Sequence, residues 1–219
     1  MNHIKKLCML LTACCLMASV ANAQDEEKVL VYPQLFVGVQ SGIQTTLTDY
    51  NNWKLITPTG SLSLGAFFTP VVGARLHFNG FWNKGGYYDD TEDFKCEYKY
   101  LSTNIDLMVN MVTLIGKKNY YPLNLYLIGG LGLNCAWGND DAYAHQNKML
   151  LAYDNTRCSH NARLGVMLDY DVSKHVSINL EVSANNLNDR YNSRKSDKGD
   201  WQITTQLGVA YKFAGKKAK

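Results

Sequence analysis

Hydrophobic and polar residues alternate with a period of two along most of the chain after Leu35. Leu62 and Leu64, for example, alternate with Ser61 and Ser63. Such alternation puts apolar side chains on one face of a β-strand and small or polar side chains on the other. The segments have the length of about ten residues with which a tilted strand crosses a bilayer. Eight strands are predicted, over residues 35–45, 61–68, 72–82, 100–109, 123–137, 161–170, 176–185 and 201–213.

The connections between these strands alternate between long and short. Those after the second and sixth strands are tight, around Thr69-Pro70 and residues 172–174. The connection after the fourth strand, residues 111–122, is longer, and we expect a helical turn in it. Long loops at one end and short turns at the other are typical of outer-membrane barrels, whose long loops are extracellular. The long polar connections are residues 46–60, 83–97, 138–158 and 186–200.

Aromatic residues on the apolar face gather near both ends of the strands, as in the two interfacial girdles of a membrane barrel. The pattern therefore predicts an all-β fold, an eight-stranded antiparallel up-and-down transmembrane β-barrel. The predicted girdle residues are Trp82, Trp137 and Trp201 at the long-loop ends, and Phe68, Tyr170, Tyr211 and Phe213 at the opposite ends.

The N-terminus has the pattern of a secretory signal peptide. Lys5 and Lys6 precede an apolar run over residues 7–20, which ends at the small-residue cleavage pattern Ala21-Asn22-Ala23. Residues 11–14 also resemble a lipoprotein signal, but cleavage there would leave a very short apolar run. The expected organisation is a signal peptide over 1–23, an N-terminal periplasmic segment over 24–34, the barrel over 35–213 and a basic periplasmic tail over 214–219.

Charge adds little to this interpretation. The whole chain has a formal net charge of +3, and loss of Lys5 and Lys6 with the leader brings it to about +1. A nearly neutral chain without a basic stripe indicates no nucleic-acid partner.

Three of the six cysteines lie in the leader, and Cys96, Cys135 and Cys158 remain. Three scattered cysteines lack the paired spacing of a zinc site, so we expect no metal and no cofactor. Cys135 and Cys158 share the outward parity and flank the same long loop, whereas Cys96 has the opposite parity. They are the candidate disulfide.

Four charged residues point into the barrel by strand parity: Arg75, Asp106, Arg163 and Glu181. Folding the third and fourth strands about their turn sets Arg75 nearly opposite Asp106, and folding the sixth and seventh brings Arg163 diagonally close to Glu181. An eight-stranded barrel has an interior just wide enough for side chains, and ionised groups there must pair. We therefore expect a lumen plugged by an interior charge network, with little or no conductance.

Two groups of residues have the composition of a hydrolase site. His175, Ser177 and Glu181 share the inward parity beside a tight periplasmic turn, whereas an enzyme acting on lipid A needs its nucleophile at the outer leaflet. Ser159 and His160 are adjacent in a strand and so point to opposite faces. Neither set indicates catalysis, and we expect no enzymatic activity.

Two charged stretches lie in the long loops. The acidic residues between 89 and 93 lack the glycine turn of a calcium loop and are interpreted as a solvated loop. The last long loop is basic, and guanidinium groups bind phosphate through two hydrogen bonds. Candidate contacts to lipopolysaccharide phosphates are Arg190, Arg194, Lys195 and Lys198.

Three runs resemble a known family: Phe68 to Leu76, Ile105 to Met111, and the closing Leu207 to Phe213. In order and spacing they are similar to the β-barrel domains of outer-membrane-protein-A-type proteins that lack the peptidoglycan-binding module. The resemblance implies a Gram-negative cell envelope. It also implies insertion by the barrel-assembly machinery, which reads a terminal aromatic, although residues 214–219 follow Phe213 here.

The expected function is that of a non-enzymatic envelope protein whose outer loops contact lipopolysaccharide, surface ligands or a host molecule. A small or gated pore and a lipid A modifying barrel enzyme remain alternatives. A further alternative is a secreted lipocalin-like carrier, in which the two strand faces would be inverted, with the apolar side chains inside.

Overall fold

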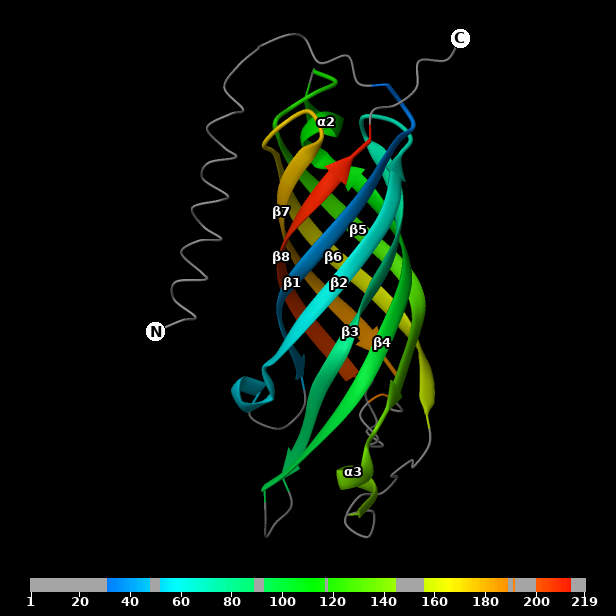
Figure 1. The fold of residues 1–219 in the computed structure, drawn as a ribbon, viewed down its shortest axis with the longest axis vertical. Coiled ribbons are helices and arrows are strands. Elements are labelled where there is room, and N and C mark those ends of the chain that lie inside the picture. The colour runs from blue at the N-terminus through cyan, green and yellow to red at the C-terminus, as the bar shows by residue number, and fades with distance from the viewer. Residues whose placement is uncertain are drawn as a thin grey trace.

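The computed structural model describes residues 31–47, 52–88, 93–116, 118–144, 156–188, 191 and 200–213. These residues form a closed barrel in which each strand pairs antiparallel with the next and the last strand pairs with the first. Figure 1 shows the strands inclined steeply across the barrel wall. The predicted eight-stranded up-and-down barrel is confirmed.

The labels of Figure 1 are kept below. The strands are β1 (Gln34–Leu47), β2 (Thr57–Phe67), β3 (Val72–Tyr88), β4 (Asp93–Asn110), β5 (Leu123–Trp137), β6 (Arg157–Asp171), β7 (Val176–Leu187) and β8 (Asp200–Lys212). The short helical segments are η1 (Asn52–Leu55), α2 (Met111–Ile115) and α3 (Asp140–Ala144). No helix among the described residues is long and apolar enough to cross a membrane.

Closure depends on β1 and β8, which pair from Phe36 opposite Lys212 to Leu47 opposite Trp201. The start of β1 and the end of β8 therefore lie at the same end of the barrel, together with α2 and the short turns (Figure 1). This is called the short-turn end, and the opposite end, which carries η1 and α3, is called the long-loop end. By the convention of outer-membrane barrels the short-turn end is periplasmic.

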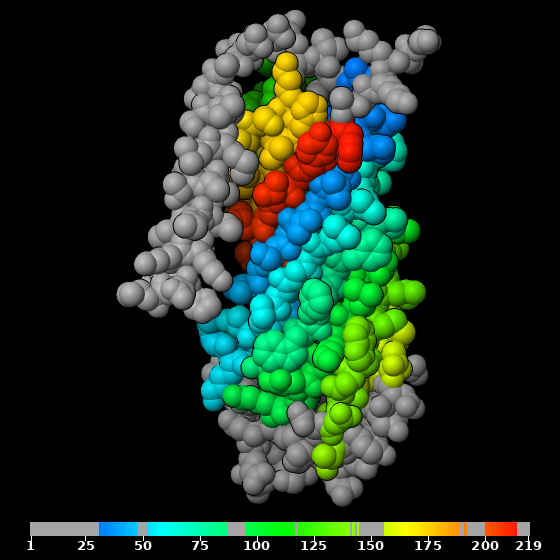
Figure 2. Space-filling model, in the orientation of Figure 1, coloured from blue at the N-terminus to red at the C-terminus, as the bar shows by residue number. Residues whose placement is uncertain are grey.

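The two faces of the wall differ in polarity. On β1, Leu35, Val39 and Ile43 are exposed on the outside, whereas Gln40 and Gln44 are buried inside. Figure 2 shows the side chains of β8, β1 and β2 as continuous diagonal bands over the outer surface. Apolar side chains outside and polar side chains inside are the arrangement of a lipid-embedded barrel. The inverted, lipocalin-like alternative is therefore wrong.

The tight turns are held by short polar side chains. The Thr69 hydroxyl accepts hydrogen bonds from the backbone nitrogens of Val71 and Val72, at 3.2 and 2.9 Å. The Ser173 hydroxyl does the same for His175 and Val176. Such bonds satisfy backbone donors that the sheet leaves unpaired.

The expected helical turn after the fourth strand is α2. Its N-cap is Asn110, whose side-chain oxygen accepts from the backbone nitrogens of Val112 and Thr113. An asparagine at this position satisfies the free donors of the first turn, which explains why the chain turns into a helix directly after β4.

The connection between β3 and β4 differs most from its prediction. The segment 83–97 was expected to be a loop, but β3 continues to Tyr88 and β4 begins at Asp93, with these two residues paired in register. Above the bilayer the outward face of a strand meets water, so polar residues such as Lys84 and Glu97 are compatible with β-structure there. Of the acidic stretch, residues 89–92 lie outside the described residues, and Asp93 is the first residue of β4.

Candidate functional site in the barrel lumen

Four buried charges meet in the middle of the lumen. Arg75 Nε donates to Asp106 Oδ2 at 2.9 Å, and the two terminal nitrogens of Arg75 donate to the two carboxylate oxygens of Glu181 at 2.9 and 2.8 Å. Arg163 Nη2 donates to Glu181 Oε1, and its Nη1 lies 3.6 Å from Asp106 Oδ2. All four side chains are at most 2% exposed. They form a closed ring of alternating charge, called the charge ring below.

The strand register explains only part of this ring. Arg75 and Asp106 are direct partners on β3 and β4, so their contact follows from the pairing. Arg163 pairs with Asn185, four positions from Glu181, and reaches the carboxylate because its side chain is long. The Arg75 to Glu181 contact joins β3 to β7 across the lumen, and pairwise strand reasoning missed it because these strands are not neighbours.

Small and polar neighbours make room for the charge ring and bind it. An added Cβ at Gly130 would lie 2.1 Å from Asp106 Oδ1, so only glycine leaves space for that carboxylate. Gln40 Nε2 donates to Asn179 Oδ1 at 2.7 Å and to Glu181 Oε2 at 3.3 Å. Hydrogen bonds of this kind offset the desolvation of buried charge, which otherwise costs several kcal/mol per ion.

Toward the short-turn end the lumen contains large apolar side chains. The rings of Phe36 and Phe67 stack with centroids 4.8 Å apart, and those of Phe67 and Tyr126 with centroids 5.4 Å apart. Large apolar residues at inward positions near the strand ends were a signal for this group in the sequence, but the sequence analysis did not use it. We call it the apolar cluster: Phe36, Phe67, Met108, Tyr126, Ile128 and Met167.

Toward the long-loop end the lumen contains hydrogen-bonded tyrosines. The Tyr191 ring meets the edges of Tyr98 and Tyr100, with centroids 5.2 and 5.7 Å apart. Its hydroxyl accepts from Asn83 Nδ2 at 2.7 Å and from Gln202 Nε2 at 2.9 Å. Tyr191 belongs to the connection after β7, so a loop residue enters the barrel. No periodicity marks such a residue, and the sequence analysis missed it. Tyr98, Tyr100 and Tyr191 are called the tyrosine cluster.

The predicted girdle residues all lie on the outer surface. Trp82 is held in place there, because its indole nitrogen donates to Glu97 Oε2 at 3.1 Å and Lys84 Nζ lies 4.6 Å from its ring centroid. The other six are 39 to 55% exposed: Phe68, Trp137, Tyr170, Trp201, Tyr211 and Phe213.

Two further exposed aromatics lie near the long-loop end, and the sequence analysis missed both. Trp53, in η1, is 84% exposed. Phe81 is 77% exposed although it pairs with Thr59 and Tyr100, which point inward. Its φ of 134° is unusual for a residue with a side chain and marks local backbone strain. Strict strand parity cannot anticipate such a reversal.

Cys135 and Cys158 are direct partners on β5 and β6 and form a disulfide. It joins the two strands just below the long connection between them. Cys96, on β4, is buried and is not part of this disulfide.

The three residues of the candidate hydrolase site, His175, Ser177 and Glu181, are not brought together. Ser177 and Glu181 are buried inside, and Glu181 belongs to the charge ring. His175 was expected on the same face, but it lies in the turn before β7, and its ring stacks on the outer residue Tyr211. That expectation is wrong because strand parity does not extend into a turn. Ser159 is buried inside whereas His160 is exposed, on opposite faces of β6.

The remaining candidate groups can be placed only in part. Arg190, Arg194, Lys195 and Lys198 lie outside the described residues. Within the part of the chain that the structure describes, no group of three or more His, Cys, Asp or Glu side chains is arranged to hold a metal ion.

A closed eight-stranded barrel with an apolar outer face, aromatic residues at both ends and a polar interior defines an integral outer-membrane β-barrel protein. The sequence comparison identifies the family. Residues 10–213 match the outer membrane protein beta-barrel domain, and the chain belongs to that family. No curated protein matches the sequence.

Several solved structures share the fold at low sequence identity. Neisserial surface protein A (NspA) is 14% identical with a TM-score of 0.53, over 82% of this chain and 97% of that chain. OprG from Pseudomonas aeruginosa is 15% identical with a TM-score of 0.54, over 85% and 98%. Ail of Yersinia pestis, in complex with the heparin analogue sucrose octasulfate, is 13% identical with a TM-score of 0.50, over 84% and 100%.

Proposed function

We propose that the protein is a non-enzymatic component of the outer membrane whose lumen is closed by its own side chains and whose extracellular loops bind anionic surface ligands, lipopolysaccharide first among them. In this proposal the chain is exported by a signal peptide cleaved after Ala23 and inserted by the barrel-assembly machinery. The observation that carries the proposal is the charge ring, which joins opposite walls of the barrel.

Closure of the lumen is supported by three successive layers of side chains. The charge ring occupies the middle, the apolar cluster lies toward the periplasm and the tyrosine cluster toward the outside. An ion crossing the lumen would have to break paired charges and then enter a layer of mainly apolar side chains. Both steps are costly in a narrow, dry interior.

Closure is tested by measuring the conductance of planar lipid bilayers that contain the purified mature protein. We expect no stepwise increase in conductance above that of a protein-free membrane, because no layer opens without loss of packing. Discrete, regular conductance steps that scale with the protein added would contradict closure and favour the pore alternative.

Ligand binding by the loops rests on chemistry at the long-loop end. The basic residues of the last long loop come directly before β8 in the sequence, and β8 begins at the long-loop end. Lipopolysaccharide carries phosphates, which guanidinium groups bind through two hydrogen bonds. Among proteins of the same fold, Ail was crystallised with a heparin analogue. An anionic ligand at the outer loops is therefore the chemistry we propose for this chain.

The loop proposal is tested by replacing the four basic residues Arg190, Arg194, Lys195 and Lys198 with glutamine. The binding of purified lipopolysaccharide to the protein in detergent should weaken markedly and lose most of its salt dependence. A variant with Lys216, Lys217 and Lys219 replaced is the control with a similar loss of charge at the other end. Equal weakening in both variants would show a nonspecific charge effect and reject the loop site.

A further inference from the structure

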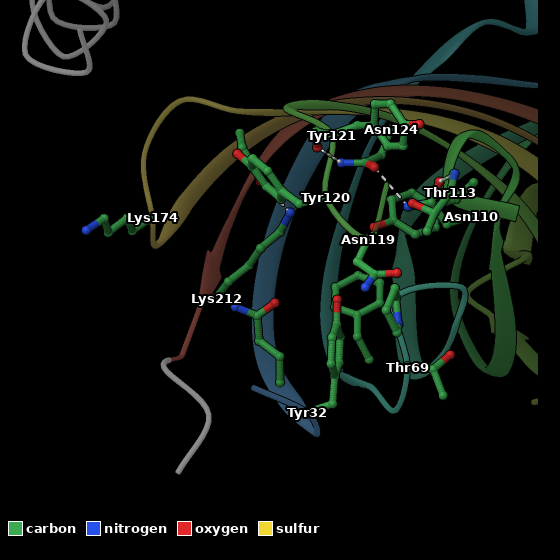
Figure 3. A pocket seen from close by; sticks show the side chains of 15 residues that line it. Tyr32, Thr69, Asn110, Thr113, Asn119, Tyr120, Tyr121, Asn124, Lys174 and Lys212 are labelled. Carbon is green, nitrogen blue, oxygen red and sulfur yellow. Dashed lines mark hydrogen bonds and ion pairs between the residues drawn. The ribbon is translucent and has the colours of Figure 1, made fainter. Parts of the chain in front are cut away.

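A polar pocket opens at the short-turn end of the barrel, outside the apolar cluster. It lies between the start of β1, the turn after β2, the connection that follows α2, and the end of β8. In Figure 3 the side chains of Tyr32, Asn119 and Tyr120 surround the same space, with Lys212 on one side and Thr69 on the other. The pocket is open to solvent, and its interior admits only groups about the size of a water molecule or a hydroxyl.

One wall of the pocket is built from amides that are already paired. Asn110 Nδ2 donates to Asn124 Oδ1 at 2.8 Å, and Asn124 Nδ2 donates to the backbone oxygen of Tyr121 at 2.9 Å, as Figure 3 shows. Asn110 also caps α2 with its side-chain oxygen. These bonds fix the connection after α2 against the barrel and give the pocket a firm wall.

Other polar groups that line the pocket lack such partners. Gln34 is only 7% exposed, yet its side-chain amide makes no hydrogen bond to any of the described residues. The same holds for the exposed amide of Asn119. The Thr69 hydroxyl accepts two backbone bonds and still has its own proton to donate. These amide groups and the hydroxyl proton line the pocket without a partner among the described residues, so a ligand that supplies donors and acceptors can bond to them.

The ion pairs at the pocket leave little net charge for a charged ligand. Lys212 Nζ lies 2.6 Å from both Asp169 Oδ2 and Asp171 Oδ1, so the three groups together carry one negative charge. Lys174 also lines the pocket and brings the sum to about zero. Burial, helped by the nearby Asp171, raises the pKa of Tyr120 to about 12, so this hydroxyl stays neutral. The ligand that fits is therefore neutral and rich in hydroxyl or amide groups.

Aromatic rings supply the other half of the recognition. Tyr32, Tyr120 and Tyr121 line the pocket, and a tyrosine carries an apolar ring beside a polar hydroxyl. A sugar ring has matching features, because its C–H face packs on an aromatic ring while its hydroxyl or acetamido groups point outward. Only such small groups could enter the narrow interior and reach Gln34.

We propose that this pocket binds a neutral saccharide, with the sugar ring against Tyr32 and Tyr120 and its hydroxyl or acetamido groups hydrogen-bonded to Gln34, Asn119 and Thr69. By the orientation of the barrel the site faces the periplasm. It is separate from the outer loops of the proposed function, and neither proposal depends on the other.

The test uses the full mature barrel, folded in detergent micelles, with maltotriose and the trimer of N-acetylglucosamine as probes. Calorimetry or NMR titration should give a dissociation constant on the order of 1 mM for at least one of them. Gln34→Leu should weaken binding about tenfold, as expected for one lost hydrogen bond at a buried site, and Asn119→Ala about threefold. Trp53→Ala and Asn188→Ala, which alter exposed residues at the long-loop end, are the matched controls and should leave binding unchanged.

Each variant is first shown to fold by its gel mobility before and after boiling, so that loss of binding is not loss of the barrel. The two probes separate ligands recognised through acetamido groups from those recognised through hydroxyls alone. Absence of saturable binding of both probes at about 20 mM, well above the expected constant, would overturn the proposal. Binding that persists in Gln34→Leu, or that trialanine displaces fully, would reject the saccharide site as well.

Discussion

The two ends of the lumen are filled by side chains that interact in different ways. Toward the periplasm the apolar cluster packs six strand residues whose contacts are non-directional. Toward the outside the tyrosine cluster depends on directed hydrogen bonds, such as Asn83 to Tyr191, and on a residue contributed by a loop. One barrel is thus filled by its wall at one end and by an inserted loop side chain at the other. We expect the first to depend on side-chain volume and the second on individual polar atoms.

The largest loss of stability is expected in the middle of the lumen, at the charge ring. Arg75→Ala removes the partner of two buried carboxylates and should lower the free energy of unfolding by about 4 kcal/mol. Urea titration in lipid vesicles, followed by tryptophan fluorescence, measures the change. Lys84→Ala is the control, because its pair with Glu97 is partly exposed and should contribute less than about 1 kcal/mol.

The interaction itself is measured by double-mutant cycles of Arg75 with Asp106 and with Glu181. Both couplings should exceed about 1 kcal/mol, because each pair shares direct hydrogen bonds. Couplings below about 0.5 kcal/mol would mean that each charge is hydrated separately. That result would remove the charge ring as the central layer of the proposed closure.

The second-largest loss of stability is expected in the apolar cluster, and two adjacent phenylalanines allow it to be measured. Phe67→Ala creates a cavity inside the barrel and should lower the free energy of unfolding by about 3 kcal/mol. Phe68→Ala changes the next residue, which is 55% exposed on the outer surface, and should have a clearly smaller effect. Equal losses for the two variants in the same urea titration would contradict the importance of inward packing.

The third effect concerns the wall near the tyrosine cluster. Reducing the disulfide between Cys135 and Cys158, which are 23 positions apart, should lower the free energy of unfolding by about 2 to 3 kcal/mol. The Cys135→Ser, Cys158→Ser double variant should match the reduced protein and show no further response to reductant. Mass spectrometry that finds all three mature thiols free in the oxidised protein would exclude the bond.

The smallest loss of stability is expected in the tyrosine cluster, where one hydroxyl can be removed without changing the packing of the ring. Tyr191→Phe keeps the ring but removes the acceptor for Asn83 and Gln202, and should lower the free energy of unfolding by about 1 to 2 kcal/mol. Tyr211→Phe removes a hydroxyl from an outer residue and should change the free energy of unfolding by less than about 0.5 kcal/mol. If Tyr191→Phe is also neutral, the two ends of the lumen do not differ in the way described above.

The sequence was informative wherever a residue's environment follows from its position in a strand. Alternation identified the eight strands and their two faces, because a strand in a membrane barrel must present apolar groups to lipid on every second residue. It also sets Arg75 beside Asp106 once β3 and β4 are paired. It failed at Phe81 and His175, where a strained backbone and a turn break the parity on which the reasoning depends.

The sequence alone determined the fold, the two faces of the wall and the ends that carry long and short connections, because these follow from local periodicity and neighbouring strand pairs. Only the tertiary structure decided which side chains meet across the lumen. The contact of Arg75 with Glu181, the entry of Tyr191 and the pocket around Gln34 all join segments far apart in the chain. Closing the sheet into a barrel brings these segments together, and no local pattern in the sequence carries that information.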